Sequence, residues 1–141
     1  DRFSLDEALD QGKRVIICFY PKAFSPGCVI HHKALRDTFP LFLYASCEII
    51  GVSSDTVTCH QRFVEKYKLP YRMISDPENT MRELFQVPTF LNGMSPSRAT
   101  YVIDPRTRRI AHICRSELQP QEHAFTALES VCQLLESEMR T

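Results

Sequence analysis

The stretch VIICFYPKAFSPGC, residues 15–28, joins a buried strand to the start of a helix. Its first six residues are a continuous apolar run that Pro21 ends, which is typical of a strand buried on both faces. Pro26 suits the first turn of a helix, so Cys28 lies in that turn. Unpaired backbone N–H groups and the positive end of the helix dipole favour a thiolate there. The stretch therefore predicts a nucleophilic cysteine, with a buried structural cysteine as the alternative.

Further along the chain, apolar runs alternate with segments of helical spacing. Because two early strands are separated by a helix and a late hairpin adds antiparallel strands, we predict an α/β fold, a central mixed β-sheet with helices on both faces. We also expect Pro40 to end or kink the second helix, and residues 87–97 to form a loop. Helices are expected at residues 4–9, from Pro26 toward Thr38, from the capping residues Ser53-Ser54-Asp55 to Tyr67, at 80–85 and from about Pro120. Strands are expected at residues 15–20, 48–53, 73–74, 99–103 and 109–113.

Composition limits the classes of protein to which the chain can belong. It has 141 residues, 43% of them apolar and 24% charged, so we expect residues 1–141 to form a single globular domain. Seventeen Lys and Arg balance seventeen Asp and Glu, and a neutral chain has no general attraction to nucleic acid or anionic membranes. No apolar run approaches the roughly 18 residues of a membrane span. Six cysteines in a chain with a full core indicate thiol reactivity rather than a small disulfide scaffold.

The motif of Pro21, Ser25 and Cys28 resembles the Pro-x-x-x-Thr/Ser-x-x-Cys signature of the peroxiredoxins. The string FYPKAFSPGC is similar to the bacterioferritin-comigratory-protein (PrxQ) branch of that family. The resemblance continues through EIIGVSSDTVTCHQRFVEKYKLPYRMISDP, residues 48–77, and through the strand from Arg98 to Asp104. It implies a thioredoxin-like fold and a thiol peroxidase that reduces hydrogen peroxide and organic hydroperoxides.

The same resemblance implies a role for each matching residue. Cys28 is expected to be the peroxidatic cysteine, which cycles through a sulfenic acid. Arg98 would steady the thiolate and the peroxide, Ser25 would hydrogen-bond the peroxide, and Pro21 would shield the pocket from water. Preorganised donors of this kind stabilise the charge that develops on the leaving oxygen. We expect no metal, flavin or haem cofactor, because a thiolate suffices as the nucleophile.

Two positions depart from the family pattern. Many family members have a glutamate three residues after the peroxidatic cysteine, where it helps to orient the arginine, and this chain has His31. Many PrxQ proteins have a resolving cysteine five residues after the peroxidatic one, and here that position is Lys33. Cys59 is the best resolving candidate, although it lies about one turn before the usual position, which Val64 occupies. A one-cysteine mechanism, in which an external thiol reduces Cys28, stays equally open.

The resemblance also sets expectations about partners and location. We expect a peroxide substrate, thioredoxin or a similar thiol reductant, no nucleic acid or membrane partner, and a monomer or weak dimer. The family usually has an N-terminal hairpin that this sequence lacks, so we expect a trimmed or short protein. An intracellular, cytoplasmic location is expected, with an organelle as the alternative. The other cysteines are expected to pack in the core: Cys18, Cys47, Cys114 and Cys132.

Three other functions compete with the peroxidase. A thioredoxin-like dithiol oxidoreductase needs Cys-x-x-Cys, and this chain has Cys28-Val-Ile-His31. A redox sensor or interaction protein with the same fold would oxidise at Cys28 but turn over poorly. A metal-binding module is weakly indicated, since its candidate ligands lack a second regularly spaced pair. The adjacent His31 and His32 are expected on different helix faces, and a histidine exposed to solvent is the simpler explanation for them. The candidate ligands of the module are Cys28, His31, His32, Cys59 and His60.

Overall fold

A computed structural model describes residues 3–87, 89–90, 95–96, 98–115 and 119–140. The helices are α1 (Leu5–Asp10), α2 (Pro26–Tyr44), α3 (Val57–Tyr67), α4 (Thr80–Leu84) and α5 (Glu122–Met139). The strands are β1 (Arg14–Phe19), β2 (Cys47–Ser53), β3 (Arg72–Ser75), β4 (Thr89–Phe90), β5 (Ser95–Pro96), β6 (Ala99–Asp104) and β7 (Arg109–Cys114).

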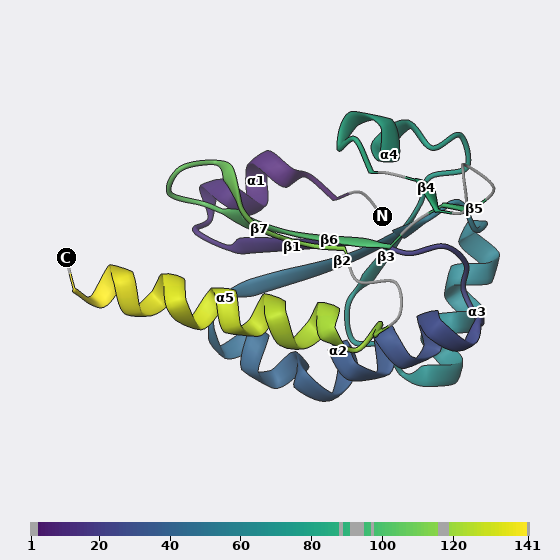
Figure 1. The fold of residues 1–141 in the computed structure, drawn as a ribbon, viewed down its shortest axis with the longest axis horizontal. Helices are drawn as coiled ribbons and strands as arrows, with labels where there is room; N and C mark the ends of the chain where they lie inside the picture. Colours follow the sequence, from purple (N-terminus) through teal and green to yellow (C-terminus); the bar gives the residue numbers. More distant parts are fainter. Residues whose placement is uncertain (1–2, 88, 91–94, 97, 116–118, 141) are drawn as a thin grey trace.

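Five of these strands form one mixed sheet in the order β3-β2-β1-β6-β7 (Figure 1). The first three strands are parallel to one another, whereas β6 is antiparallel to both β1 and β7. In the register of the central strand, Cys18 lies between Gly51 of β2 and Thr100 of β6. The arrangement confirms the predicted mixed sheet, in which a helical crossover gives the parallel pair and a hairpin gives the antiparallel pair.

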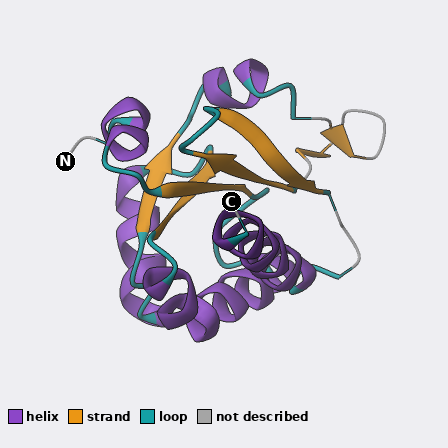
Figure 2. Ribbon diagram, turned by 90° about the vertical axis from the view of Figure 1, so that its left-hand side faces the viewer, coloured by secondary structure: helices purple, strands orange, loops and turns teal. Residues whose placement is uncertain are grey.

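Helices cover both faces of the sheet, as the sequence predicts. The short helices α1 and α4 lie on one face, and the longer helices α2, α3 and α5 lie on the other (Figures 1 and 2). All six residues of β1 are buried, and alternate side chains serve the two layers. Ile16 and Cys18 pack toward α2 and α5, whereas Val15, Ile17 and Phe19 pack toward α1 and α4. No helix in the described part of the chain combines the length and the apolar character that crossing a membrane requires.

Two predictions about local structure are wrong in part. Of the two alternatives for Pro40, the one in which it ends the helix is wrong, because α2 continues to Tyr44. Pro40 is exposed and removes only one backbone hydrogen bond, while the turn beyond it buries Phe42 completely in the core. The segment 87–97 is not entirely a loop, because β4 and β5 form a short antiparallel ladder within it. Thr and Phe suit an extended backbone, and proline is tolerated in a short edge strand. Residues 88, 91–94 and 97 lie outside the described part.

Candidate active site

Cys28 lies in the first turn of α2, where a loop, residues 21–25, leads from β1 into the helix. Ser25 is the N-cap residue and Pro26 the first helical residue, a position where proline costs little. The backbone ladder begins when Val29 N–H donates to the Ser25 carbonyl oxygen at 2.9 Å, so earlier N–H groups point out of the helix end. The Cys28 side chain is fully buried. The positive end of the helix dipole therefore acts on it with little screening by water.

Arg98 approaches Cys28 from the residue before β6. Its Nη2 donates to Cys28 Sγ at 3.3 Å, and only 4% of the Arg98 surface is exposed. Gly27 makes this approach possible, because a Cβ there would lie 3.2 Å from Arg98 Nη2 and 3.5 Å from Pro120 Cγ. A side chain at position 27 would therefore crowd the guanidinium. A buried guanidinium beside the sulfur stabilises negative charge on the sulfur and on an oxygen that is bound near it.

His31 holds the other side of the same guanidinium. Arg98 Nη1 and His31 Nδ1 lie 2.7 Å apart, and a guanidinium can only donate, so Nδ1 accepts and the ring is neutral with its proton on Nε2. The ring is fully buried, and Nε2 has no hydrogen-bond partner among the described residues. Burial lowers the pKa of His31 well below its usual value, and neighbouring histidines and Arg98 lower it further. A neutral acceptor therefore takes the place where the resemblance leads us to expect a glutamate.

His31 belongs to a cluster of three fully buried histidines. Its ring centroid lies 4.7 Å from that of His32, in a stacked arrangement, and 4.9 Å from that of His123 on α5. His32 Nδ1 is 2.6 Å from the Tyr71 hydroxyl oxygen, and His123 Nδ1 is 2.7 Å from Thr100 Oγ1. Burial first, and nearby positive charge second, lower the pKa of His32 to about 3. Burial therefore favours the neutral form of both His31 and His32.

The expectation of a solvated histidine is wrong for this pair. Adjacent helical residues are about 100° apart, but α2 is covered by the sheet on one side and by α5 on another, so both rings are buried. His123 is a member of the cluster that the sequence gives no signal for. It lies in the first turn of α5, and only the packing of α5 against α2 brings its ring to His31.

Hydrogen bonds fix the loop before Cys28 at both of its ends. The Ser25 hydroxyl donates to the Lys22 carbonyl oxygen at 2.7 Å, so toward a bound molecule its oxygen is an acceptor. Pro21, which is half-buried, follows Tyr20, whose carbonyl oxygen accepts from Arg82 Nη2 of α4 at 2.9 Å. These contacts give the loop a defined path over the helix end.

Asp55 connects this loop to the start of α3. Its Oδ2 accepts from Ala23 N–H at 2.7 Å and from the Ser53 hydroxyl at 2.6 Å. Since the Ser53 hydrogen goes to Asp55, the contact of 2.7 Å between Ser53 Oγ and His60 Nε2 is donated by the histidine. The predicted capping role of Ser53-Ser54-Asp55 is wrong, because Thr56 is the N-cap residue of α3. Asp55 instead stabilises the loop, which no local sequence pattern indicates.

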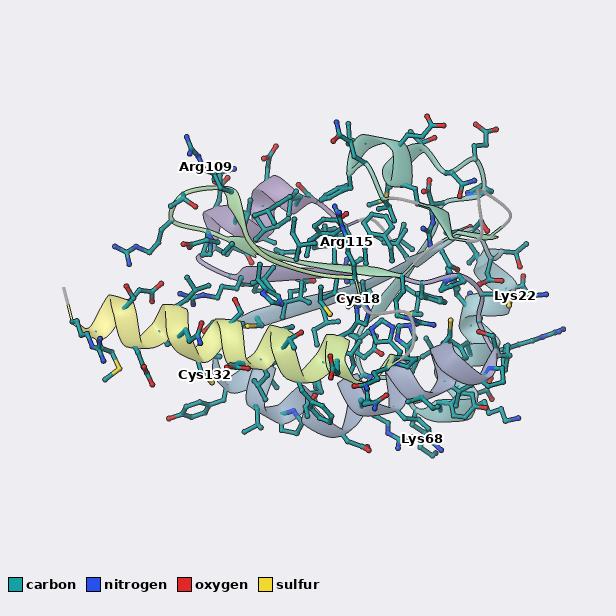
Figure 3. The ribbon with its side chains drawn as sticks, in the orientation of Figure 1. Cys18, Lys22, Lys68, Arg109, Arg115 and Cys132 are labelled. Carbon is teal, nitrogen blue, oxygen red and sulfur yellow. The ribbon has the colours of Figure 1, made fainter. Side chains whose placement is uncertain are left out.

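All six cysteines are unpaired thiols, and their burial differs. Cys18, Cys47 and Cys114 are buried, as predicted, and burial raises the pKa of Cys18 and of Cys47 to about 12. Cys132 is exposed on α5 (Figure 3), so the prediction that it packs is wrong.

Cys59 lies in the first turn of α3 and is partly buried against the core that α2, α3 and α5 share. Its N–H donates to Thr56 Oγ1 at 3.1 Å. Burial raises the pKa of the Cys59 thiol, and the charge and hydrogen bond of Asp55 raise it further, so the thiol is kept protonated. No group of three or more His, Cys, Asp or Glu side chains within the described ranges could hold a metal ion, which leaves the metal-binding module without a site there.

Comparisons with known proteins agree on one family. The family model described as AhpC/TSA matches residues 1–113. Chloroplastic peroxiredoxin Q of Suaeda salsa is 40% identical over 119 residues, which are 84% of this chain and 55% of that protein. The chain thus spans about half the length of the curated relatives it matches. The crystal structure of peroxidoxin BcpB from Mycobacterium tuberculosis superimposes with a TM-score of 0.81 and 30% identity, over 92% of this chain and 84% of that chain. Peroxiredoxin Q of Xanthomonas campestris superimposes with a TM-score of 0.79 and 26% identity, over 86% of this chain and 79% of that chain.

Proposed function

The chain belongs to the AhpC/TSA family, and from that premise we propose that it is a thiol peroxidase that reduces hydrogen peroxide and organic hydroperoxides through Cys28. One observation carries the proposal: Cys28 Sγ is buried at a helix N-terminus and accepts a hydrogen bond of 3.3 Å from the guanidinium of Arg98. The helix N-terminus and the guanidinium both stabilise negative charge on the sulfur and on an oxygen that is bound beside it. Thioredoxin-like dithiol exchange at this motif is not supported, because His31 occupies the position of the second cysteine.

Each site residue has a proposed part in the reaction. The Cys28 thiolate attacks one peroxide oxygen, the O–O bond breaks, and the other oxygen leaves as hydroxide or alkoxide, which takes up a proton. The sulfur is oxidised to a sulfenic acid and the peroxide is reduced by two electrons. Arg98 stabilises the charge on both oxygens, and Ser25 Oγ accepts a hydrogen bond from the peroxide O–H. Pro21 limits the access of water, and His31 keeps Arg98 directed at the sulfur.

The second half of the cycle needs thiol electrons. We propose Cys59 as the resolving thiol, which attacks the Cys28 sulfenic acid, forms a disulfide and releases water. Its position in the first turn of α3, beside the network that holds the loop of Cys28, supports this role. Direct reduction of Cys28 by an external thiol is the alternative. Thioredoxin or a similar donor would supply the electrons in both routes.

The experiment compares Cys28→Ser with Cys132→Ser, a matched control that removes an exposed thiol. Peroxide consumption with dithiothreitol is expected to fall to the level of a blank in Cys28→Ser and to stay unchanged in Cys132→Ser. Equal consumption by Cys28→Ser and the unsubstituted chain would refute the proposal. Mass spectrometry after one equivalent of peroxide separates the routes, since a Cys28–Cys59 disulfide means two cysteines and an unpaired Cys28 sulfenic or sulfinic acid means one. A single burst without turnover would identify a redox sensor instead.

Location and organisation complete the proposal. We propose that residues 1–141 act as one domain built on the five-stranded sheet. An intracellular site of action is proposed, and the chloroplastic names of the plant relatives support an organelle as that site.

A further inference from the structure

Basic and aromatic side chains surround the loop that leads into Cys28. Phe24 of the loop lies 6.2 Å from Tyr67 of α3, measured between ring centroids. Lys66 Nζ lies 6.0 Å from the Phe24 centroid and 5.6 Å from that of Tyr67, and Lys33 Nζ of α2 lies 5.9 Å from Tyr67. Lys22, from the same loop, extends outward from this end of the molecule (Figure 3). We call these five residues the basic-aromatic surface.

The surface carries positive charge that nearby acids do not neutralise. Among the described residues, none of its three lysines forms a salt bridge. The acidic side chains around it are directed elsewhere: Asp37 pairs with its neighbour Arg36, Asp55 accepts from the loop and from Ser53, and Glu65 lines a cavity beside β3. A local positive potential on a chain of zero net charge favours a negatively charged partner.

Phe24 is placed on this surface against its own backbone preference. Its φ of 67° lies in the left-handed region, which is costly for a bulky side chain. The ring is held on α3 by Phe63, at 5.1 Å between centroids, yet 39% of the residue stays exposed. A partly exposed aromatic ring, flanked by long cationic side chains, is the type of anchor that protein interfaces use.

The elements that carry both proposed redox thiols meet at this surface. Phe24 precedes Cys28 by four residues, and its loop ends at the N-cap of α2. The charges of Lys22 and Arg62 lower the pKa of Cys59, although burial and Asp55 raise it by more. A molecule that binds here therefore contacts the loop that leads to Cys28 and the helix that carries Cys59.

We propose that the basic-aromatic surface docks a dithiol reductant protein with an acidic face; this inference rests on the proposed function and names the partner's chemistry. Cavities of about 540 and 630 Å³ lie around β3, and no residue of the surface lines either of them. A small ligand needs a concave site, whereas a protein can bind a surface that is not hollowed. Two thiols of the partner become a disulfide, while the Cys28–Cys59 disulfide gains two electrons and two protons. On the one-cysteine route, the Cys28 sulfenic acid gains two electrons and two protons, which returns the thiol and releases water.

The experiment measures kcat/KM for reduced thioredoxin, regenerated by its reductase and NADPH, in Lys33→Glu and Lys66→Glu. Arg109→Glu is the matched control, because it makes the same charge change at the far end of the molecule (Figure 3). Each lysine variant should lose about tenfold in kcat/KM at low ionic strength, and the loss should shrink with added salt. The control should change less than about twofold. Turnover with dithiothreitol should be equal in all four proteins.

The outcomes separate the two proposals. If thioredoxin supports all four proteins equally, or if its kcat/KM does not depend on salt, the docking surface is wrong while the peroxidase stands. If no protein consumes peroxide with dithiothreitol, the proposed function itself is wrong. A loss that dithiothreitol reproduces would mean that the substitutions damage the site rather than the docking, and would also overturn the inference.

Discussion

The two faces of the central sheet use neighbouring residues of the same strands and yet differ in their chemistry. On the face of α1 and α4, β1 and β6 contribute hydrocarbon and aromatic side chains, and the Tyr101 hydroxyl donates to the Phe85 carbonyl oxygen. On the face of α2 and α5, the same two strands contribute Ile16 and Val102 but also Cys18 and Thr100, and Thr100 Oγ1 contacts His123 of the buried histidine cluster.

The difference separates stability from chemistry. Hydrocarbon side chains contribute to folding by burial alone, at roughly 25 cal/mol per Å². Buried polar groups must be paired to avoid a cost, and the pairs on the α2 and α5 face also hold the thiol and the guanidinium in place. We therefore expect substitutions on the first face to change the free energy of unfolding, and those on the second to change reactivity.

The largest expected effect is on stability alone. Ile17 is 2% exposed and packs on the face of α1 and α4. Ile17→Ala should lower the free energy of unfolding by about 2 to 5 kcal/mol, measured by urea denaturation, because it leaves a cavity in the core. The rate of Cys28 oxidation per folded molecule should be unchanged in a single-turnover assay. Should Ile17→Ala fail to fold, Ile17→Val, at about 0.5 to 1.5 kcal/mol, serves instead. A fall in the oxidation rate would break the separation of the two faces.

The sheet could be predicted because its signals are local. The apolar run at 15–20 and the hairpin at 99–113 indicate strands from their own residues, and the order of elements limits the topology. The continuation of α2 past Pro40 could not be predicted, because the burial of Phe42 that offsets the lost hydrogen bond is a tertiary contact.

The family resemblance pointed to Arg98, but from the residues alone the site was predictable only where a motif is continuous. Cys28 follows from the strand–helix junction, whereas the contact of Arg98 with it joins residues 70 positions apart. The sequence shows that His31 replaces an acid but not that its ring contacts the rings of two other histidines. Those contacts depend on how α5 packs over α2, which one sequence does not encode in any local pattern.

The second expected effect concerns His31, which we regard as a positioning residue for Arg98. His31→Phe keeps a buried ring but removes the acceptor, and a hydrogen bond to a charged group contributes about 1.5 to 3 kcal/mol. The rate of Cys28 oxidation by hydrogen peroxide should therefore fall by roughly 10- to 100-fold, measured by stopped-flow kinetics. His31→Gln supplies a neutral amide oxygen and should recover most of the rate. Equal rates in the two variants would mean that His31 has a packing role only.

The smallest expected effect is a dependence of stability on pH that comes from one face only. The folded chain lowers the pKa of His32 from 6.5 to about 3, mainly through burial. Between these values the unfolded chain binds a proton that the folded chain does not, so the stability present above pH 6.5 is lost as the pH falls toward 3, by roughly 1 kcal/mol for each pH unit.

His32→Gln, which keeps a partner for the Tyr71 hydroxyl, should show a shallower slope of unfolding free energy against pH, measured by urea denaturation between pH 7 and 5. Ile17 packs among hydrocarbon and aromatic side chains, so Ile17→Val should keep the full slope while its curve lies lower at every pH. Identical slopes for His32→Gln and the unsubstituted chain would show that His32 does not cause the acid sensitivity, and the contrast between the two faces would lose its electrostatic part.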